Sequence, residues 1–225
     1  MPRHPIIPET RTPSLAGVTR DLRDITYGPT YFQGARHDHG KCNVLAGELI
    51  YTLFRPSSVV DWGCGGGYVL HPLLLRGVRC LGLDVSESAF DFARELGGDP
   101  LAACIQIANL NDDPRPIIEG YDIALAIESL EHIAPESTVP VVEAICRSAP
   151  LVIISSPPPS GKNNPLHTNE RLTEEWVEIF GAAGYEPDKA TADAVRAAMR
   201  SVRTCSGVCV PSWWTSSYLG VYRAS

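Results

Sequence analysis

A glycine-rich segment that directly follows an apolar run constrains the fold more than any other feature of the chain. Residues 59–67 read VVDWGCGGG and hold four glycines in the five positions 63–67. Glycine adopts positive φ readily and lets a ligand approach the backbone closely. In open parallel sheets, ligands bind beyond the carboxyl ends of the strands. We therefore expect a ligand-binding turn between a first strand and the helix that follows it.

Apolar runs alternate with helical patterns along the rest of the chain. Strands are expected over residues 57–62, 79–85, 103–108, 121–127, 151–155 and 218–223. Helices are expected over residues 43–54, 68–75, 86–96, 139–147, 173–183 and 192–202, with Ser86 as an N-cap and Gly184 as a C-terminal stop. Apolar strands that alternate with helices are typical of a parallel sheet covered on both faces. The chain is therefore predicted to be an α/β protein.

The composition narrows the class of protein. With 225 residues, 44% hydrophobic and 20% charged, the chain fits one globular domain rather than a disordered protein. A net charge of −7 argues against nucleic acid as a partner, because phosphate-binding proteins usually carry a basic face. Apolar runs fall short of the ~20 residues of a membrane-spanning helix. The seven scattered cysteines do not form a disulfide pattern, so a cytoplasmic protein without membrane contact is expected. Its oligomeric state stays open.

The glycine-rich turn discriminates between two classes of cofactor. The dinucleotide pattern G-x-G-x-x-G would need a glycine where the sequence has Tyr68, and Asp61 would repel its pyrophosphate. The alternative pattern, acidic-x-G-x-G-x-G, is met in full by Asp61, Gly63, Gly65 and Gly67. A carboxylate at this position suits a cofactor that has a cationic amino group and no phosphate. A nicotinamide oxidoreductase remains the alternative.

The segment VVDWGCGGG resembles the glycine-rich motif of the class I S-adenosylmethionine (SAM) dependent methyltransferases. This resemblance implies a Rossmann-like, seven-stranded, mostly parallel sheet with helices on both faces and an antiparallel last strand. It implies SAM as the cofactor. The residues implied to bind it are Asp61, Gly63, Cys64, Gly65, Gly67, Asp84, Asn109, Leu110 and Glu128.

Three of these positions follow later strands, each with its own implied role. Asp84 ends the second strand, where an acidic residue accepts the ribose hydroxyls in such folds. Asn109 follows the third strand and is implied to meet the adenine, although capping of its loop is an alternative. Glu128 follows the fourth strand, where the family lines the methyl end of the cofactor.

Two histidines follow the fourth and fifth strands, where an acceptor would bind. Methyl transfer is an in-line displacement, and a hydroxyl or amino acceptor must also lose a proton, for which histidine is the natural base. We expect His167 as a catalytic residue and His132 as a second one, with loop hydrogen bonding and helix capping as their alternatives. Glu131 and Asn169 are expected to contact the substrate.

The segment after the fifth strand carries a narrower resemblance. The residues SSPPP at 155–159, HTNE at 167–170 and Trp176, Phe180 and Tyr185 resemble methyltransferases associated with glycan and natural-product gene clusters. This resemblance implies a small-molecule acceptor of the sugar or natural-product type. By the same analogy, residues 1–40 form an N-terminal arm and lid in which Tyr31 touches the ligands, and residues 41–225 form the methyltransferase domain.

Two further alternatives remain open. Glu128, Glu131, His132 and His167 have the ligand order of the metal-dependent methyltransferases that modify the 3′-terminal ribose of small RNAs. The acidic net charge and the lack of an Arg or Lys cluster near these residues argue against RNA, so no metal is expected. The second alternative is a SAM-binding module without catalytic activity.

Overall fold

The computed structural model describes residues 40–112, 115–161, 164–206 and 212–225. The expected N-terminal arm and lid, with Tyr31, lies outside the described residues apart from Gly40. The division of the chain at residues 40 and 41 therefore stays a prediction.

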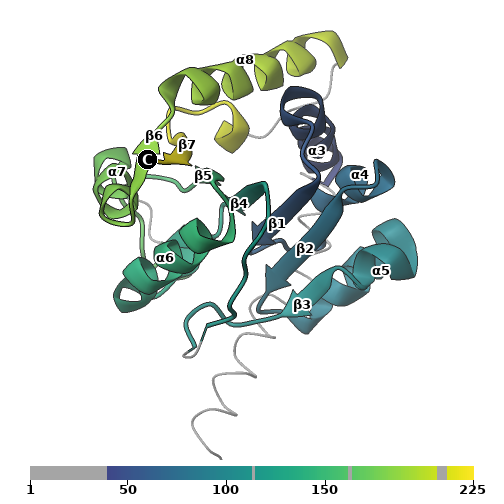
Figure 1. The fold of residues 1–225 in the computed structure, drawn as a ribbon, viewed down its shortest axis with the longest axis horizontal. Helices are drawn as coiled ribbons and strands as arrows, with labels where there is room; N and C mark the ends of the chain where they lie inside the picture. The colour runs from purple at the N-terminus through teal and green to yellow at the C-terminus, as the bar shows by residue number, and fades with distance from the viewer. Residues whose placement is uncertain (1–39, 113–114, 162–163, 207–211) are drawn as a thin grey trace, which may run out of the picture.

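The described strands form one seven-stranded sheet in the order β3-β2-β1-β4-β5-β7-β6 (Figure 1). The strands are β1 Ser58–Trp62, β2 Arg79–Asp84, β3 Ile105–Ile107, β4 Ile123–Ile127, β5 Leu151–Ser155, β6 Tyr185–Pro187 and β7 Leu219–Ala224. Strands β1 to β5 pair in parallel, whereas β7 runs antiparallel to both β5 and β6. The seven-stranded, mostly parallel sheet with an antiparallel last strand is therefore confirmed.

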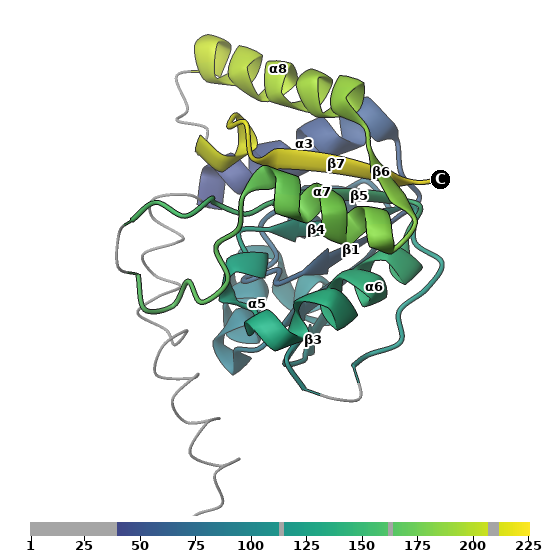
Figure 2. The same ribbon diagram turned by 90° about the vertical axis from the view of Figure 1, so that its left-hand side faces the viewer.

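Helices cover both faces of the sheet. They are α3 Lys41–Phe54, α4 Leu70–Leu75, α5 Glu87–Ala102, α6 Thr138–Ser148, α7 Thr173–Ala182 and α8 Lys189–Ser206, with short 3₁₀ turns η2 Leu130–His132, η3 Pro135–Ser137 and η4 Ser212–Trp214. One core packs α3, α4, α5 and α8 on one face, and a second core packs α6 and α7 on the other (Figures 1 and 2). Across the described residues, every helix is too short or too polar to cross a membrane.

Successive side chains of a strand contribute to the two cores in turn. In β1, Val59 belongs to the core beneath α3 and α4, whereas its neighbour Val60 belongs to the core beneath α6. Successive strand residues point to opposite faces, so a strand covered on both sides must be apolar throughout. At the α7 end, Phe180 stacks on Tyr222 of β7 with ring centroids 4.1 Å apart.

The expected elements are present, most of them with bounds shifted by a few residues, and three differences stand out. The helix expected to end at residue 96 continues to Ala102, across an interruption at Gly98 with φ +71°. The C-terminal helix begins at Lys189, before the expected residue 192. Strand β6 was not located from the sequence, because it spans three residues and includes Pro187, which cannot donate a backbone hydrogen bond.

The order in which the strands are added to the sheet reverses at β1. The chain adds β2 and then β3 on one side of β1, and then crosses back to place β4 on the other side. The crevice beyond the carboxyl ends of such a strand pair is where open α/β sheets bind ligands. The turns that follow β1, β2, β4 and β5 therefore define the region in which a functional site is expected.

Candidate active site

The turn after β1 depends on glycine at three positions. Gly63 has φ +87°, Gly65 has φ +52° and Gly67 has φ +72°, conformations that other residues adopt at a cost. The amide of Gly63 donates to the Leu83 carbonyl at 2.8 Å. A Cβ on Gly63 would lie 2.4 Å from the Cβ of Ser129, so the turn after β1 packs directly against the turn after β4.

Replacing Gly63 with alanine tests this close packing. We expect Gly63→Ala to lower the free energy of unfolding by about 1–3 kcal/mol and to weaken cofactor binding, because it adds both backbone strain and a clash with Ser129. Gly77→Ala is the matched control for strain alone, since Gly77 has φ +79° but open space around it. Gly181→Ala in α7 is a second control, in which neither backbone strain nor a clash is expected. Urea titration that ranks Gly63→Ala equal to Gly77→Ala would contradict the packing argument.

Asp61 is a buried carboxylate with an unsatisfied oxygen. Its side chain lies at the end of β1 and the residue is 3% exposed. Among the described residues, Oδ1 has no hydrogen-bond partner. Burial, reinforced by the negative charge of Asp84, raises the pKa of Asp61 to about 7. An unpaired carboxylate is costly to bury, so this position is suited to receive a cationic group from a ligand.

Asp84 joins the glycine turn to the start of α5. Its Oδ2 accepts the Gly65 amide at 2.8 Å and its Oδ1 accepts the Ser86 amide at 2.9 Å. Ser86 itself caps α5 by accepting the Ser88 amide, as the sequence predicted. Burial raises the pKa of Asp84, while the backbone N–H groups of Ser86, Gly65 and Val85 oppose that shift. Each carboxylate oxygen has a second lone pair, so the group can still accept hydroxyls of a ligand.

Three other residues implied to bind the cofactor are engaged with the protein itself. The Asn109 Oδ1 accepts the Asn111 amide at 3.2 Å and its Nδ2 donates to Asp112, which is the loop-capping alternative. Leu110 is buried in the core beneath α6. Burial raises the pKa of the Cys64 thiol, which packs against Gly82. Contacts of Asn109, Leu110 and Cys64 with a cofactor stay predictions.

Glu128 holds an unusual backbone conformation at the carboxyl end of β4. Its φ is +51°, which is uncommon for a residue other than glycine. The Ser155 hydroxyl donates to Glu128 Oε1 at 2.9 Å, and the Glu128 amide donates to the Ser155 carbonyl at 2.9 Å. Burial raises the pKa of Glu128 to about 7. Strain of this kind concentrates at functional sites, which supports a ligand-binding role.

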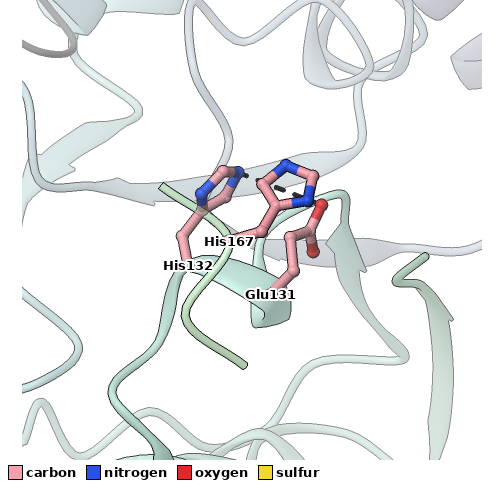
Figure 3. A group of neighbouring side chains, drawn as sticks. All are labelled: Glu131, His132 and His167. Carbon is pink, nitrogen blue, oxygen red and sulfur yellow. Dashed lines mark ion pairs between the residues drawn. The ribbon is translucent and has the colours of Figure 1, made fainter. Parts of the chain in front are cut away.

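Glu131, His132 and His167 converge on one point (Figure 3). One ligand atom from each of the three lies within 4.8 Å of the others. The rings of His132 and His167 meet edge to face with centroids 4.9 Å apart. Glu131 is 1% exposed, and its Oε2 has no hydrogen-bond partner among the described residues. The turn after β4 and the loop after β5 thus place two imidazoles and a carboxylate together.

Backbone and side-chain bonds hold these two segments against each other. His132 Nδ1 contacts the Leu166 carbonyl at 3.0 Å. The buried Asn169 side chain donates to the Leu130 carbonyl at 3.0 Å, and the Asn169 amide donates to the Glu131 carbonyl at 3.0 Å. Asn169, expected to contact the substrate, therefore docks the loop, and a substrate contact from it stays a prediction.

Electrostatics inside this group favour a neutral imidazole and a protonated acid. Burial, followed by the negative charge of Glu128, raises the pKa of Glu131 well above its usual value. Burial lowers the pKa of His132. Without an added positive charge, the interior therefore disfavours the ionised form of Glu131.

The structure brings most of the expected site residues to one edge of the sheet. Asp61, Asp84 and Glu128 lie at the carboxyl ends of β1, β2 and β4. Two contributors were not assigned from the sequence. Ser155 orients Glu128, and Glu170 accepts the Nδ1–H of His167 at 2.8 Å. The position of Glu170, three residues after His167, is the sequence signal that could have predicted this contact.

SAM fits the donors and acceptors of this edge. Its ammonium group would meet the unpaired Oδ1 of Asp61, which is the buried acceptor that lacks a partner. Its ribose diol would meet the remaining lone pairs of Asp84. The positive φ values of Gly63 and Gly65 turn the backbone close to this position without side chains in the way. The residues present thus fit the cofactor that the sequence implied.

The chain is similar in sequence to known methyltransferases. Residues 60–148 match the model of a methyltransferase domain family. The ubiquinone biosynthesis O-methyltransferase of Azoarcus sp. (strain BH72) is 31% identical over 100 residues, which are 44% of this chain and 43% of that protein. The protein of the same name from Idiomarina loihiensis is 34% identical over 33% of this chain and 31% of its own length. The chain thus spans less than half the length of these curated relatives.

Solved structures show the same fold over more of the chain. The 1,6-didemethyltoxoflavin-N1-methyltransferase of Burkholderia thailandensis covers 98% of this chain and 94% of its own, with a TM-score of 0.59 and 18% identity. The magnesium protoporphyrin IX methyltransferase of Synechocystis PCC 6803, solved with bound SAM, covers 75% and 86%, with a TM-score of 0.57 and 18% identity. These structures show that the chain has the fold of known methyltransferases, and residues 60–148 are the part that matches a methyltransferase domain model.

Proposed function

We propose that the chain transfers the methyl group of SAM to a hydroxyl or amino group of a small molecule. The observation that carries the proposal is the unpaired, buried carboxylate of Asp61, which lies at the same sheet edge as Asp84 and the His132 and His167 pair. The first two residues supply what a cationic nucleoside cofactor needs. The imidazoles lie beyond the strands, where an acceptor could reach the methyl group.

The residues of this edge divide between the two substrates. SAM supplies an electrophilic methyl group on its sulfonium. Asp61 and Asp84 hold the two ends of the cofactor, and the strained turn at Glu128 lines the side that faces the acceptor. His167 and His132 orient the acceptor or receive its proton. Holding acceptor and methyl in line, away from water, supplies most of the rate gain in such a displacement.

The acceptor class and location are part of the proposal. The resemblance of the 167–185 segment and the O-methyltransferase relatives support a small hydroxylated acceptor of the sugar or natural-product type. The net charge of −7 supports a small molecule rather than nucleic acid as the acceptor.

The proposal also includes a cytoplasmic location. The described cysteines 42, 64, 80, 104 and 146 are free, which supports a reducing compartment such as the cytoplasm.

The affinity for SAM is expected to depend on pH through Asp61. In the free protein its pKa is about 7, and only the ionised carboxylate pairs with an ammonium. Below that pH binding must release a proton, so we expect SAM affinity to fall up to about tenfold per pH unit and to be flat above about pH 8. Calorimetry at several pH values checks this. A variant that keeps the neutral amide, Asp61→Asn, should show no such slope.

Transfer of a labelled methyl group tests the proposal itself. Purified chain is incubated with tritiated-methyl SAM and, separately, with a bacterial metabolite extract and with total RNA. We expect label in a small extractable product, and none in this product with Asp61→Asn. Label in RNA alone would replace the proposal by the RNA ribose enzyme. SAM binding without label in either pool would favour a non-catalytic SAM-binding module.

A further inference from the structure

Glu131 is a buried carboxylate on the acceptor side of the site, where SAM has no group left to meet it. We propose that Glu131 holds a basic amino group of the acceptor as an ammonium ion, so that the substrate is an aminated small molecule. Glu131 lies in the 3₁₀ turn η2 after β4, and Figure 3 shows its side chain pointing toward His167 of the loop after β5. The class of substrate that this names rests on the proposed methyl transfer.

The negative charge of Glu131 is not compensated where it lies. The residue is 1% exposed, and its Oε2 has no hydrogen-bond partner among the described residues. Burial, followed by the charge of Glu128, raises the pKa of Glu131 well above its usual value. The Ser156 hydroxyl opposes this shift, but it is neutral and cannot balance a charge. An ionised carboxylate buried in this way needs a cation beside it.

The surrounding protein does not supply that cation. In the parts of the chain that the structure describes, no Lys or Arg forms an ion pair with Glu131 or Glu128. His132 Nε2 is 3.9 Å from Glu131 Oε1, which is too long for a hydrogen bond, and burial lowers the pKa of His132. His167 is engaged by Glu170, whose Oε1 lies 2.8 Å from its Nδ1. The cation that Glu131 needs must therefore come from a ligand.

The cofactor has fewer cationic groups than this edge has acidic ones. SAM carries two, its ammonium and its sulfonium. In the proposed complex the ammonium meets Asp61 and the sulfonium faces Glu128, while Asp84 receives the neutral ribose diol. Glu131 lies three residues beyond Glu128, and its carbonyl accepts the Asn169 amide of the loop after β5. The cation beside Glu131 is therefore assigned to the acceptor.

An ammonium ion suits this position better than a neutral or an anionic group. It offers three N–H donors, and its hydrogen bonds to a carboxylate are about twice as strong as those between neutral groups. A neutral hydroxyl would leave the charge of Glu131 uncompensated. An anionic acceptor would be repelled by both Glu128 and Glu131.

The amino group held by Glu131 is not the atom that receives the methyl group. A protonated amine has no lone pair with which to attack the sulfonium methyl. The methylated hydroxyl or amine is therefore a second group of the same acceptor, placed beside His132 and His167. An amino sugar or an aminated natural product has both kinds of group.

Fractionation of the acceptor pool by charge tests this substrate class with the unmodified chain. A bacterial metabolite extract is passed over a cation-exchange resin at pH 7, and the retained and unretained fractions are each incubated with the chain and tritiated-methyl SAM. We expect label in the retained fraction alone. Treatment of that fraction with aqueous acetic anhydride, which acetylates amines and removes their charge, should abolish the labelling.

Glu131→Gln tests the residue itself, because glutamine has the shape of the protonated acid but cannot carry the charge. At limiting acceptor we expect labelling of the retained fraction to fall about 100-fold or more, with SAM affinity changed less than about threefold. More acceptor should restore most of the rate, because Glu131 acts in binding. Glu136→Gln, at an exposed position of η3, is the matched control for net charge and should label like the unmodified chain.

The outcomes separate this inference from the proposed function. Label in the unretained fraction alone, label that survives acetylation, or equal labelling by Glu131→Gln and Glu136→Gln would overturn the amine-bearing acceptor and leave methyl transfer standing. Absence of label from both fractions would contradict methyl transfer itself, and the substrate class with it. Thermal melting and SAM affinity show whether Glu131→Gln is folded, and if it is not, fractionation and acetylation decide.

Discussion

Asp61→Asn is expected to lower the affinity for SAM about 1,000-fold and, at the same time, to stabilise the cofactor-free protein. The first effect follows because the ammonium of SAM loses a buried charged partner, a loss that typically costs 3–5 kcal/mol. The second follows because the variant no longer buries an unpaired carboxylate. Loss of binding through unfolding would give the opposite change in stability, so the two effects together identify the mechanism.

The stabilisation should depend on pH in a defined direction. The pKa of Asp61 is about 7 in the folded chain and 3.8 is the ordinary value, so the native state binds this proton more tightly than the unfolded state. The destabilising effect therefore grows as pH rises from about 4 to 7 and is complete above 7. At pH 8 the variant should gain on the order of 4 kcal/mol at most, and at pH 5 less than half of that. Urea titrations at the two pH values measure it, and a variant less stable than the unmodified chain at pH 8 would contradict the account.

Asp84→Asn is expected to weaken SAM binding about 100- to 1,000-fold through the ribose. The amide would present a donor to either the Gly65 or the Ser86 amide, both of which now donate to the carboxylate. It would also offer weaker acceptors to the ribose hydroxyls, and hydrogen bonds to charged groups contribute about 1.5–3 kcal/mol each. Asp91→Asn, an exposed position on α5, is the control for the change in net charge.

A cofactor fragment separates the two aspartates. 5′-Methylthioadenosine has the ribose and adenine of SAM but lacks its ammonium and carboxylate. Its affinity should fall with Asp84→Asn and remain unchanged with Asp61→Asn. Calorimetry with this fragment therefore tests the assignment of each residue to one end of the cofactor. An equal loss in both variants would show that the two carboxylates do not act at separate ends.

The placement of Asp61, Asp84 and the glycines at one edge of the sheet could be predicted from the sequence, because its signals are local. Asp61 and the glycines lie in one short segment, and Asp84 ends an apolar run, so the parallel topology alone brings them together. The strand β6 could not be found in this way. Its three residues include Pro187 and carry no alternating pattern, and only pairing with β7 makes them a strand.

The acceptor side was only partly predictable, because its geometry depends on contacts between distant segments. His132 and His167 were both identified, but their edge-to-face contact arises from the docking of the loop after β5 onto the turn after β4. Asn169 illustrates the limit. Its substrate contact stays a prediction, but the hydrogen bond from its side chain to the Leu130 carbonyl was not predicted from the sequence. Which polar side chain is already engaged depends on tertiary packing rather than on the motif.

Hydrogen exchange in the presence of SAM tests the central claim most directly. In the proposed complex, the cofactor lies at the carboxyl ends of β1, β2 and β4. Saturating SAM should therefore slow amide exchange in residues 63–67, 84–88 and 127–132, and it should leave residues 189–201 of α8 unchanged. Protection of α8 instead, or no change at residues 63–67 under saturating SAM, would contradict the account.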